Sequence, residues 1–141
     1  MDRPEIQVYL SHVASDGPWA RELAHQLMAA GIRVVDPFDE LFPGDNWSLK
    51  IGRALEESEA MIVLISPEAV KSNWLHGEIQ YALGEERFEG RLIPVKVKPT
   101  DDFPWVLRNM QWVGGNPDEA GRGIVKILEE VGSHKVHAHS R

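Results

Sequence analysis

The sequence contains no cysteine. That absence excludes disulfide bonds, thiolate catalysis and thiolate metal sites, and it suits a protein of the reducing cytoplasm. No apolar run approaches the roughly 20 residues that a membrane span requires, and the start MDRPEIQVYL lacks the basic-then-apolar pattern of a signal peptide. We therefore expect a soluble cytoplasmic protein that makes no membrane contact.

Basic residues are also few, with 15 Lys and Arg against 22 Asp and Glu and a net charge of -7. They are scattered along the chain, so we expect no direct binding to nucleic acid. The sequence has no GxGxxG, no GxxxxGK[ST] and no GxSxG motif, which argues against a standard dinucleotide or phosphate cradle and against a serine hydrolase. The six histidines have no ligand spacing, so we expect no metal site and no resident cofactor.

What the sequence does contain is the pattern of one α/β domain. Its 141 residues are 43% hydrophobic, which is enough for a single core. The run MIVLI is apolar at every position, as expected for a central parallel strand covered on both faces. Short apolar runs typical of strands occupy residues 6–10, 32–35, 61–65, 92–97 and 111–113.

Segments with helical spacing alternate with these runs, which predicts a flavodoxin-like five-stranded parallel sheet, order 2-1-3-4-5, with helices on both faces. We assign residues 1–132 to this domain and 133–141 to a polar tail expected to be disordered. The expected helices are residues 18–30, a helix capped by Asp45 that buries Trp47, Ile51 and Leu55, residues 72–85, and a last helix that begins at Asn116 and Pro117.

The segment SNWLHGEIQYALGE places Trp74 and Glu78 one helical turn apart, just past the third strand. Ligands of such sheets bind beyond the carboxyl ends of the strands. One interpretation is a carboxylate that faces this crevice with the indole as a wall; the other is a packed Trp beside a solvated Glu. Ser11, at the end of the first strand, is either a contact for a ligand or a residue that forms a turn.

The loop DPFDELFPGDNW follows the second predicted strand and mixes acids with aromatic residues. Phe38, Leu41 and Phe42 lie too close together in the sequence for all three to reach one core, so we expect exposed apolar surface, as in a binding loop or a lid. The alternative is a loop that folds back and caps the core.

In this order and spacing, VYLSHVASD, DELFPGDNW, ALEESEAMIVLISPEAVKSNWLHGEI and FPWVLRNMQW together resemble a Toll/interleukin-1 receptor (TIR) domain of the bacterial type, over residues 5–131. Some members of that family cleave NAD, and others only self-associate. The resemblance implies that Glu78 is catalytic and that Trp74, Ser11, Phe42 and Trp47 contact the substrate.

The resemblance also implies that NAD is a substrate and no resident cofactor is used, and that copies associate through the loop Asp36–Asp45. It further implies a role in bacterial immune signalling against phage, with a sensor domain or partner protein. A non-catalytic TIR–TIR adaptor and a nucleoside deoxyribosyltransferase-like enzyme remain alternatives. The product stays open between linear ADP-ribose, a cyclised form and an exchanged base.

Overall fold

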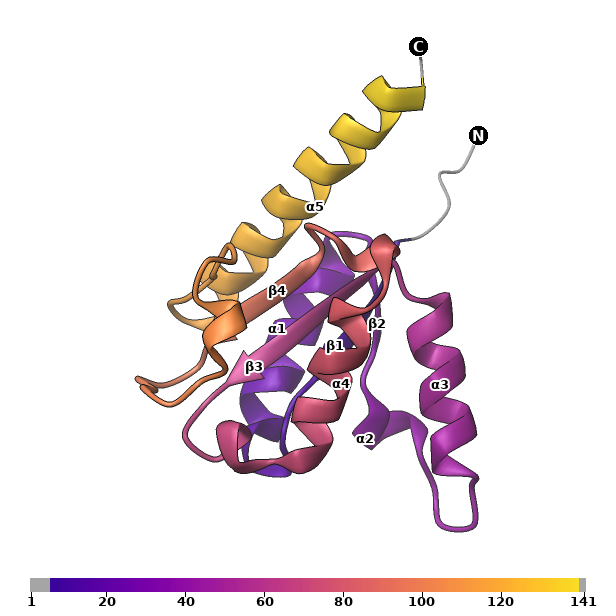
Figure 1. Cartoon of the computed structure of the whole chain (residues 1–141), viewed down its shortest axis with the longest axis vertical. Helices are drawn as coiled ribbons and strands as arrows, with labels where there is room; N and C mark the ends of the chain where they lie inside the picture. The colour runs from indigo at the N-terminus through magenta and orange to yellow at the C-terminus, as the bar shows by residue number, and fades with distance from the viewer. Residues whose placement is uncertain (1–5, 140–141) are drawn as a thin grey trace.

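A four-stranded parallel sheet of order β2-β1-β3-β4 lies at the centre of the molecule (Figure 1). The computed structural model describes the backbone of residues 6 to 139 and the side chains of residues 6 to 130. Every residue of the two central strands, β1 and β3, is buried, as the continuous apolar run MIVLI predicts for β3. The strands are β1 Gln7–Ser11, β2 Arg33–Val35, β3 Ala60–Ile65 and β4 Leu92–Lys96.

Helices cover both faces of the sheet, which confirms the predicted architecture. Because side chains alternate along a strand, Ile62 and Leu64 pack with α1 and α5, whereas Met61 and Val63 pack with α3 and α4. The helices are α1 Gly17–Ala29, α2 Pro37–Glu40, α3 Trp47–Glu57, α4 Asn73–Leu83 and α5 Pro117–His139, with short 3-10 turns at Ala14–Asp16, Ala69–Lys71, Glu86–Phe88 and Trp105–Leu107.

The expected fifth strand, residues 111–113, is reduced to a single parallel bridge between Val95 and Val113. The indole of Trp112 donates to the Leu107 carbonyl at 2.7 Å and packs edge-on against Phe103, so its side chain is held to the preceding loop. The backbone of Val113 exchanges hydrogen bonds with Pro94 and Lys96 of β4. Two glycines follow Val113 at once. The segment therefore occupies the fifth position of the order without forming a ladder.

Two details of α3 differ from the sequence prediction. Asn46 caps the helix, accepting from the Leu49 backbone N–H at 3.2 Å, whereas Asp45 accepts from the Phe42 N–H inside the loop. Ile51 is buried as predicted, but Trp47 is half exposed, because the first turn of α3 lies beyond the sheet. The prediction that Trp47 belongs to the buried stripe is wrong.

The connection between β2 and α3 contains α2, a four-residue helix that the sequence analysis treated as loop. Asp36 caps it by accepting from the Phe38 N–H at 2.9 Å, and Pro37 begins it. At the other end of the chain, α5 continues through residues 133 to 139, into the segment predicted as a polar tail. Within residues 6 to 139, no helix is long and apolar enough to cross a membrane.

Candidate active site

Glu78 is a buried acid on the face of α4 that packs against the sheet. Ser72 caps α4 by accepting from the Leu75 N–H at 3.2 Å, and Leu75 and Ile79 bury the same face. Glu78 shares this face and is only 6% exposed. A carboxylate buried to this degree is unfavourable unless hydrogen bonds compensate it. The alternative prediction, in which Glu78 is a solvated acid, is therefore wrong.

Two hydroxyl groups of β1 compensate the Glu78 carboxylate. Tyr9 and Ser11 are two residues apart on a strand, so their side chains project from the same face of the sheet. The Tyr9 hydroxyl donates to Oε2 of Glu78, and Ser11 Oγ donates to Oε1 at 2.7 Å. Each carboxylate oxygen therefore has one O–H donor, and both donors are fully buried.

This environment raises the pKa of Glu78. Burial is the largest cause, and it outweighs the hydrogen bonds from Tyr9, Ser11 and Trp74 and the charge of His12, which all lower the pKa. The pKa of Tyr9 is raised as well, by burial and then by the neighbouring Glu78 carboxylate. Tyr9 thus keeps its proton and remains a donor at physiological pH.

A second buried pair joins the end of β1 to the start of α2. His12 Nε2 lies 2.8 Å from Asp36 Oδ2, and His12 Nδ1 lies 2.9 Å from the carbonyl oxygen of Val13. Both partners accept hydrogen bonds, so both contacts are made together only when both ring nitrogens carry a proton, as in the imidazolium form of His12. The His12 ring also packs against Phe38, with 4.8 Å between ring centroids.

The net effect on His12 is a raised pKa. Burial acts to lower it, but the hydrogen bonds to Asp36 and Val13 and the charges of Asp36 and Asp16 outweigh burial. The pair therefore ties the loop that follows β2 to the strand that carries the two hydroxyl donors.

A mostly apolar cavity of about 260 Å³ opens beside Glu78. Glu78 and His12 supply its charged groups, and Trp74, at 51% exposure, stands at its rim. An apolar lining around one acid excludes water, which strengthens electrostatic interactions inside. The lining consists of His12, Pro37, Phe38, Leu41, Trp47, Ile51, Trp74 and Glu78.

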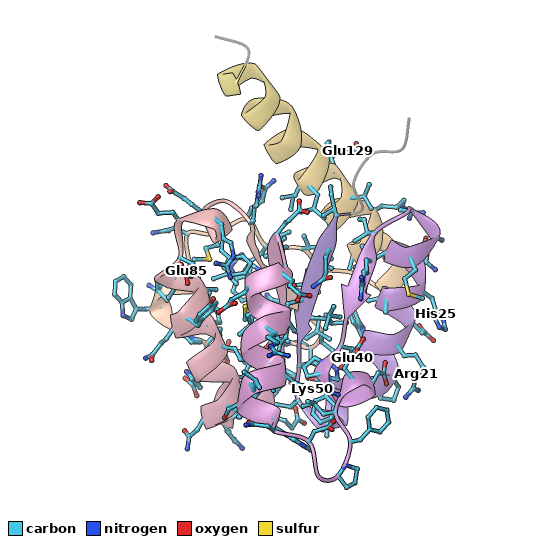
Figure 2. The ribbon with its side chains drawn as sticks, turned by 90° about the vertical axis from the view of Figure 1, so that its right-hand side faces the viewer. Arg21, His25, Glu40, Lys50, Glu85 and Glu129 are labelled. Carbon is cyan, nitrogen blue, oxygen red and sulfur yellow. The ribbon has the colours of Figure 1, made fainter. Side chains whose placement is uncertain are left out.

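The loop Asp36–Asp45 and the first turn of α3 expose several large apolar side chains. Phe42 is 61% exposed, and Phe38, Trp47 and Leu49 are about half exposed. Lys50 links the two ends of this region, because its Nζ donates to the Glu40 carbonyl at 3.2 Å and to Asp45 Oδ2 at 3.0 Å. Figure 2 shows Glu40 and Lys50 together at this end of α3. The predicted exposure of the loop is confirmed.

A family model described as TIR domain matches residues 8–128. The chain belongs to the TIR domain family. This match confirms the resemblance inferred from the motifs. A comparison with curated proteins finds no match.

Solved structures of TIR domains have the same fold. The TIR domain of the Toll-related receptor TRR-2 from Hydra magnipapillata is 26% identical, with a TM-score of 0.67 over 76% of this chain and 82% of that one. A TIR-STING receptor from C. gigas in complex with 2',3'-cGAMP is 22% identical, with a TM-score of 0.74 over 91% of this chain and 41% of that one. The TIR domains of the activated Roq1 resistosome, which recognises the pathogen effector XopQ, are 22% identical, with a TM-score of 0.66 over 88% and 99%.

The five site residues predicted for this TIR domain take different places. Glu78, Trp74 and Trp47 line the cavity together. Ser11 is buried behind the carboxylate and contacts Glu78 rather than the cavity. Phe42 lies outside the lining, although its carbonyl accepts from the Trp47 indole at 3.4 Å.

Sequence reasoning missed Tyr9 and the His12–Asp36 pair. The signal for Tyr9 was present, since a polar hydroxyl two residues before Ser11 on a wholly buried strand needs a buried partner. Asp36 is recognisable as a helix cap directly before Pro37, a first-turn residue, but its contact with His12 depends on the pairing of β1 with β2.

A larger concavity of about 460 Å³ lies at the opposite end of this TIR domain, between the end of α4 and the start of β4. Its acids include Glu85, which Figure 2 shows far from Lys50, and Glu86 and Glu89, which are exposed. No acid of that concavity is buried, and it lies at the amino ends of the strands. The larger volume of this concavity therefore does not make it a better candidate for the functional site than the cavity beside Glu78.

Proposed function

We propose that this TIR domain cleaves NAD between nicotinamide and ribose, as an effector of bacterial immune signalling. The observation that supports this most directly is Glu78, a buried carboxylate held by two hydroxyl donors beside an apolar cavity of about 260 Å³. A perturbed acid in a cleft of this kind is typical of a catalytic group.

The reaction suits a single acid. The bond between ribose C1 and the nicotinamide nitrogen breaks, its electron pair stays on nitrogen, and the cationic ring leaves as neutral nicotinamide. Most glycosidases need a second carboxyl group to protonate the leaving group, but this leaving group needs no proton. Water then adds to C1 and releases one proton, which gives ADP-ribose and nicotinamide.

Glu78 stabilises the step at which positive charge develops on the ribose. Its carboxylate accepts hydrogen bonds from ribose hydroxyls and faces the oxocarbenium-like centre, which is favourable where water is excluded. Trp74 and Trp47 provide apolar walls on which the flat nicotinamide ring packs. Ser11 acts through Glu78, because it contacts the acid and not the cavity.

Self-association belongs to the same proposal. The loop Asp36–Asp45 carries exposed apolar side chains directly at the rim of the cavity, so a second copy that covers Phe42 also shields the site from water. We expect a monomer with little activity and an active assembly, brought together by crowding, a sensor domain or a partner protein.

The test is release of nicotinamide from NAD across a wide range of protein concentration, with and without a crowding agent. We expect specific activity to rise with concentration and Glu78→Gln to lower it at least about 100-fold. Glu86→Gln, an exposed acid beyond the same helix, is the matched control and should keep activity. Absence of nicotinamide release from the wild type under crowding contradicts the proposal.

The exposed loop also favours a second candidate, a non-catalytic adaptor that acts only through TIR–TIR contacts. In that case the protein self-associates, releases no nicotinamide, and keeps its assembly in Glu78→Gln. Measuring oligomeric state and nicotinamide release in the same samples separates the two functions.

A further inference from the structure

We propose that Tyr9 is a positioning residue that aims the Glu78 carboxylate at the cavity and keeps it in its working form. The inference rests on the proposed function and adds a residue to its site. Tyr9 is fully buried in a central strand, where a Phe would fill the same space. Its hydroxyl has one hydrogen-bond partner in the described part of the chain, and that partner is Glu78.

A buried tyrosine hydroxyl without a hydrogen bond is unfavourable, because its removal from water costs free energy that burial of a Phe ring does not cost. Tyr9 lines up with Val35 of β2 and Met61 of β3, so the ladders on both sides fix its backbone. The hydroxyl therefore comes from a strand that is hydrogen-bonded on both sides, whereas Glu78 comes from the helix α4.

The two donors define the orientation of the acid. Tyr9 holds Oε2 and Ser11 holds Oε1, so the carboxylate plane cannot rotate without losing one O–H bond. A carboxylate offers about four acceptor positions, and Tyr9, Ser11 and Trp74 occupy three of them, so at least one lone pair remains free. Because Glu78 also lines the cavity, we propose that a ligand bound there uses this remaining lone pair.

The same hydrogen bond opposes protonation of Glu78. Burial raises the pKa of Glu78, and the Tyr9 hydrogen bond is the first of the contacts that lower it again. The other charged groups at this place are His12, whose charge lowers the pKa of Glu78, and Asp36, which acts on Tyr9. Without the Tyr9 hydroxyl, more of the enzyme carries a protonated, inactive Glu78 at a given pH.

The experiment compares Tyr9→Phe with the wild type by two measurements. The first is the pH profile of kcat and KM for nicotinamide release, and the second is a carbon-13 NMR titration of the Glu78 carboxyl group. We expect the acid limb of kcat to move to higher pH, with kcat lowered roughly tenfold on that limb and KM nearly unchanged. The titration of Glu78 should move to higher pH as well.

Tyr81→Phe is the matched control, since it removes a tyrosine hydroxyl from the same helix as Glu78 but one that accepts from Arg87 outside the cavity. It should leave both the pH profile and the Glu78 titration as in the wild type. An active wild type whose profile and titration are the same in Tyr9→Phe overturns this inference alone. A wild type that releases no nicotinamide overturns the proposed function and the catalytic part of this inference with it.

Discussion

At the scale of single residues, the candidate site contains one acid, Glu78, whose burial in the fold is energetically unfavourable. Glu78 is buried, its pKa is raised, and four neighbouring side chains only partly offset the effect of burial. Functional sites commonly retain groups that reduce stability because the reaction needs them. We therefore expect the charged Glu78 carboxylate, placed at an apolar cavity, to lower the free energy of unfolding at neutral pH.

Glu78→Gln should accordingly stabilise the protein at neutral pH. Since the folded-state pKa lies above the ordinary value of 4.5, the stability linked to this group is present below that pH and is lost as pH rises through the folded-state pKa. The amide carries no charge, so we expect a gain in the free energy of unfolding of roughly 1 kcal/mol at pH 7 that disappears at acidic pH.

Urea unfolding of wild type and Glu78→Gln across pH measures this gain. Glu86→Gln again serves as the control, because that acid is exposed and outside the site. A Glu78→Gln protein that is less stable than the wild type at neutral pH would show that the hydrogen bonds from Tyr9 and Ser11 outweigh the burial of charge.

At the scale of secondary-structure elements, the loop between β2 and α3 is tied to β1 by one ion pair. His12 directly follows β1, and Asp36 caps α2 with one carboxylate oxygen while it accepts from His12 with the other. The position of Phe38 against the imidazole follows from this pair. The loop that forms one wall of the cavity is thus anchored at its start and exposed at its tip.

The anchor should weaken as pH rises through the raised pKa of His12. Because the pKa of His12 is raised from 6.5, its stabilising contribution is complete below pH 6.5 and is lost as pH rises through the folded-state value. Asp36→Asn should lower the pKa of His12, since burial then acts against a weaker partner, while the Asn side chain still caps α2. An NMR titration of the imidazole measures this change.

Asp45→Asn provides the control for that titration, because Asp45 lies at the far end of the same loop and pairs with Lys50. It should leave the titration of His12 as it is in the wild type. If Asp36→Asn also leaves it unchanged, the pair does not set the charge of His12.

At the scale of the whole molecule, five of the eight large apolar side chains that are exposed in the described residues lie around the mouth of the cavity. Phe38, Phe42, Trp47, Leu49 and Trp74 are all about half exposed or more, and all come from the loop, α3 or α4 at the carboxyl ends of the strands. A monomer rarely exposes such a patch without a partner. The patch thus lies next to the cavity that Glu78 lines.

Phe42→Ser should reduce self-association without unfolding the protein. Phe42 contributes little to the core, so we expect a change in stability of no more than about 0.5 kcal/mol. Light scattering at increasing protein concentration measures assembly, and nicotinamide release in the same samples should fall with it.

Trp105→Ser is the matched control, because Trp105 is also aromatic and more exposed but belongs to the turn Trp105–Leu107 rather than to the loop Asp36–Asp45. It should leave assembly and activity unchanged. Equal effects of the two substitutions would indicate nonspecific association through exposed aromatic residues rather than a defined TIR–TIR contact.

The sequence by itself determined the kind and order of the elements and the pair of Trp74 and Glu78. Apolar periodicity, helix caps and an i, i+4 spacing act within a few residues, so they can be recognised without the fold. Apolar periodicity did not predict how far residues 111–113 would pair with their neighbour. They pair with β4 only at Val113, and the indole of Trp112 contacts Leu107 in the preceding turn.

Only the tertiary structure decided how the site is completed. The Tyr9–Glu78 hydrogen bond joins residues 69 apart in the chain, and the His12–Asp36 pair joins residues 24 apart. Both contacts depend on which strands are neighbours and in what register they pair, and no local pattern carries that information. The burial of Glu78 also depends on the tertiary structure, since this face of α4 is removed from solvent only when it packs against the sheet.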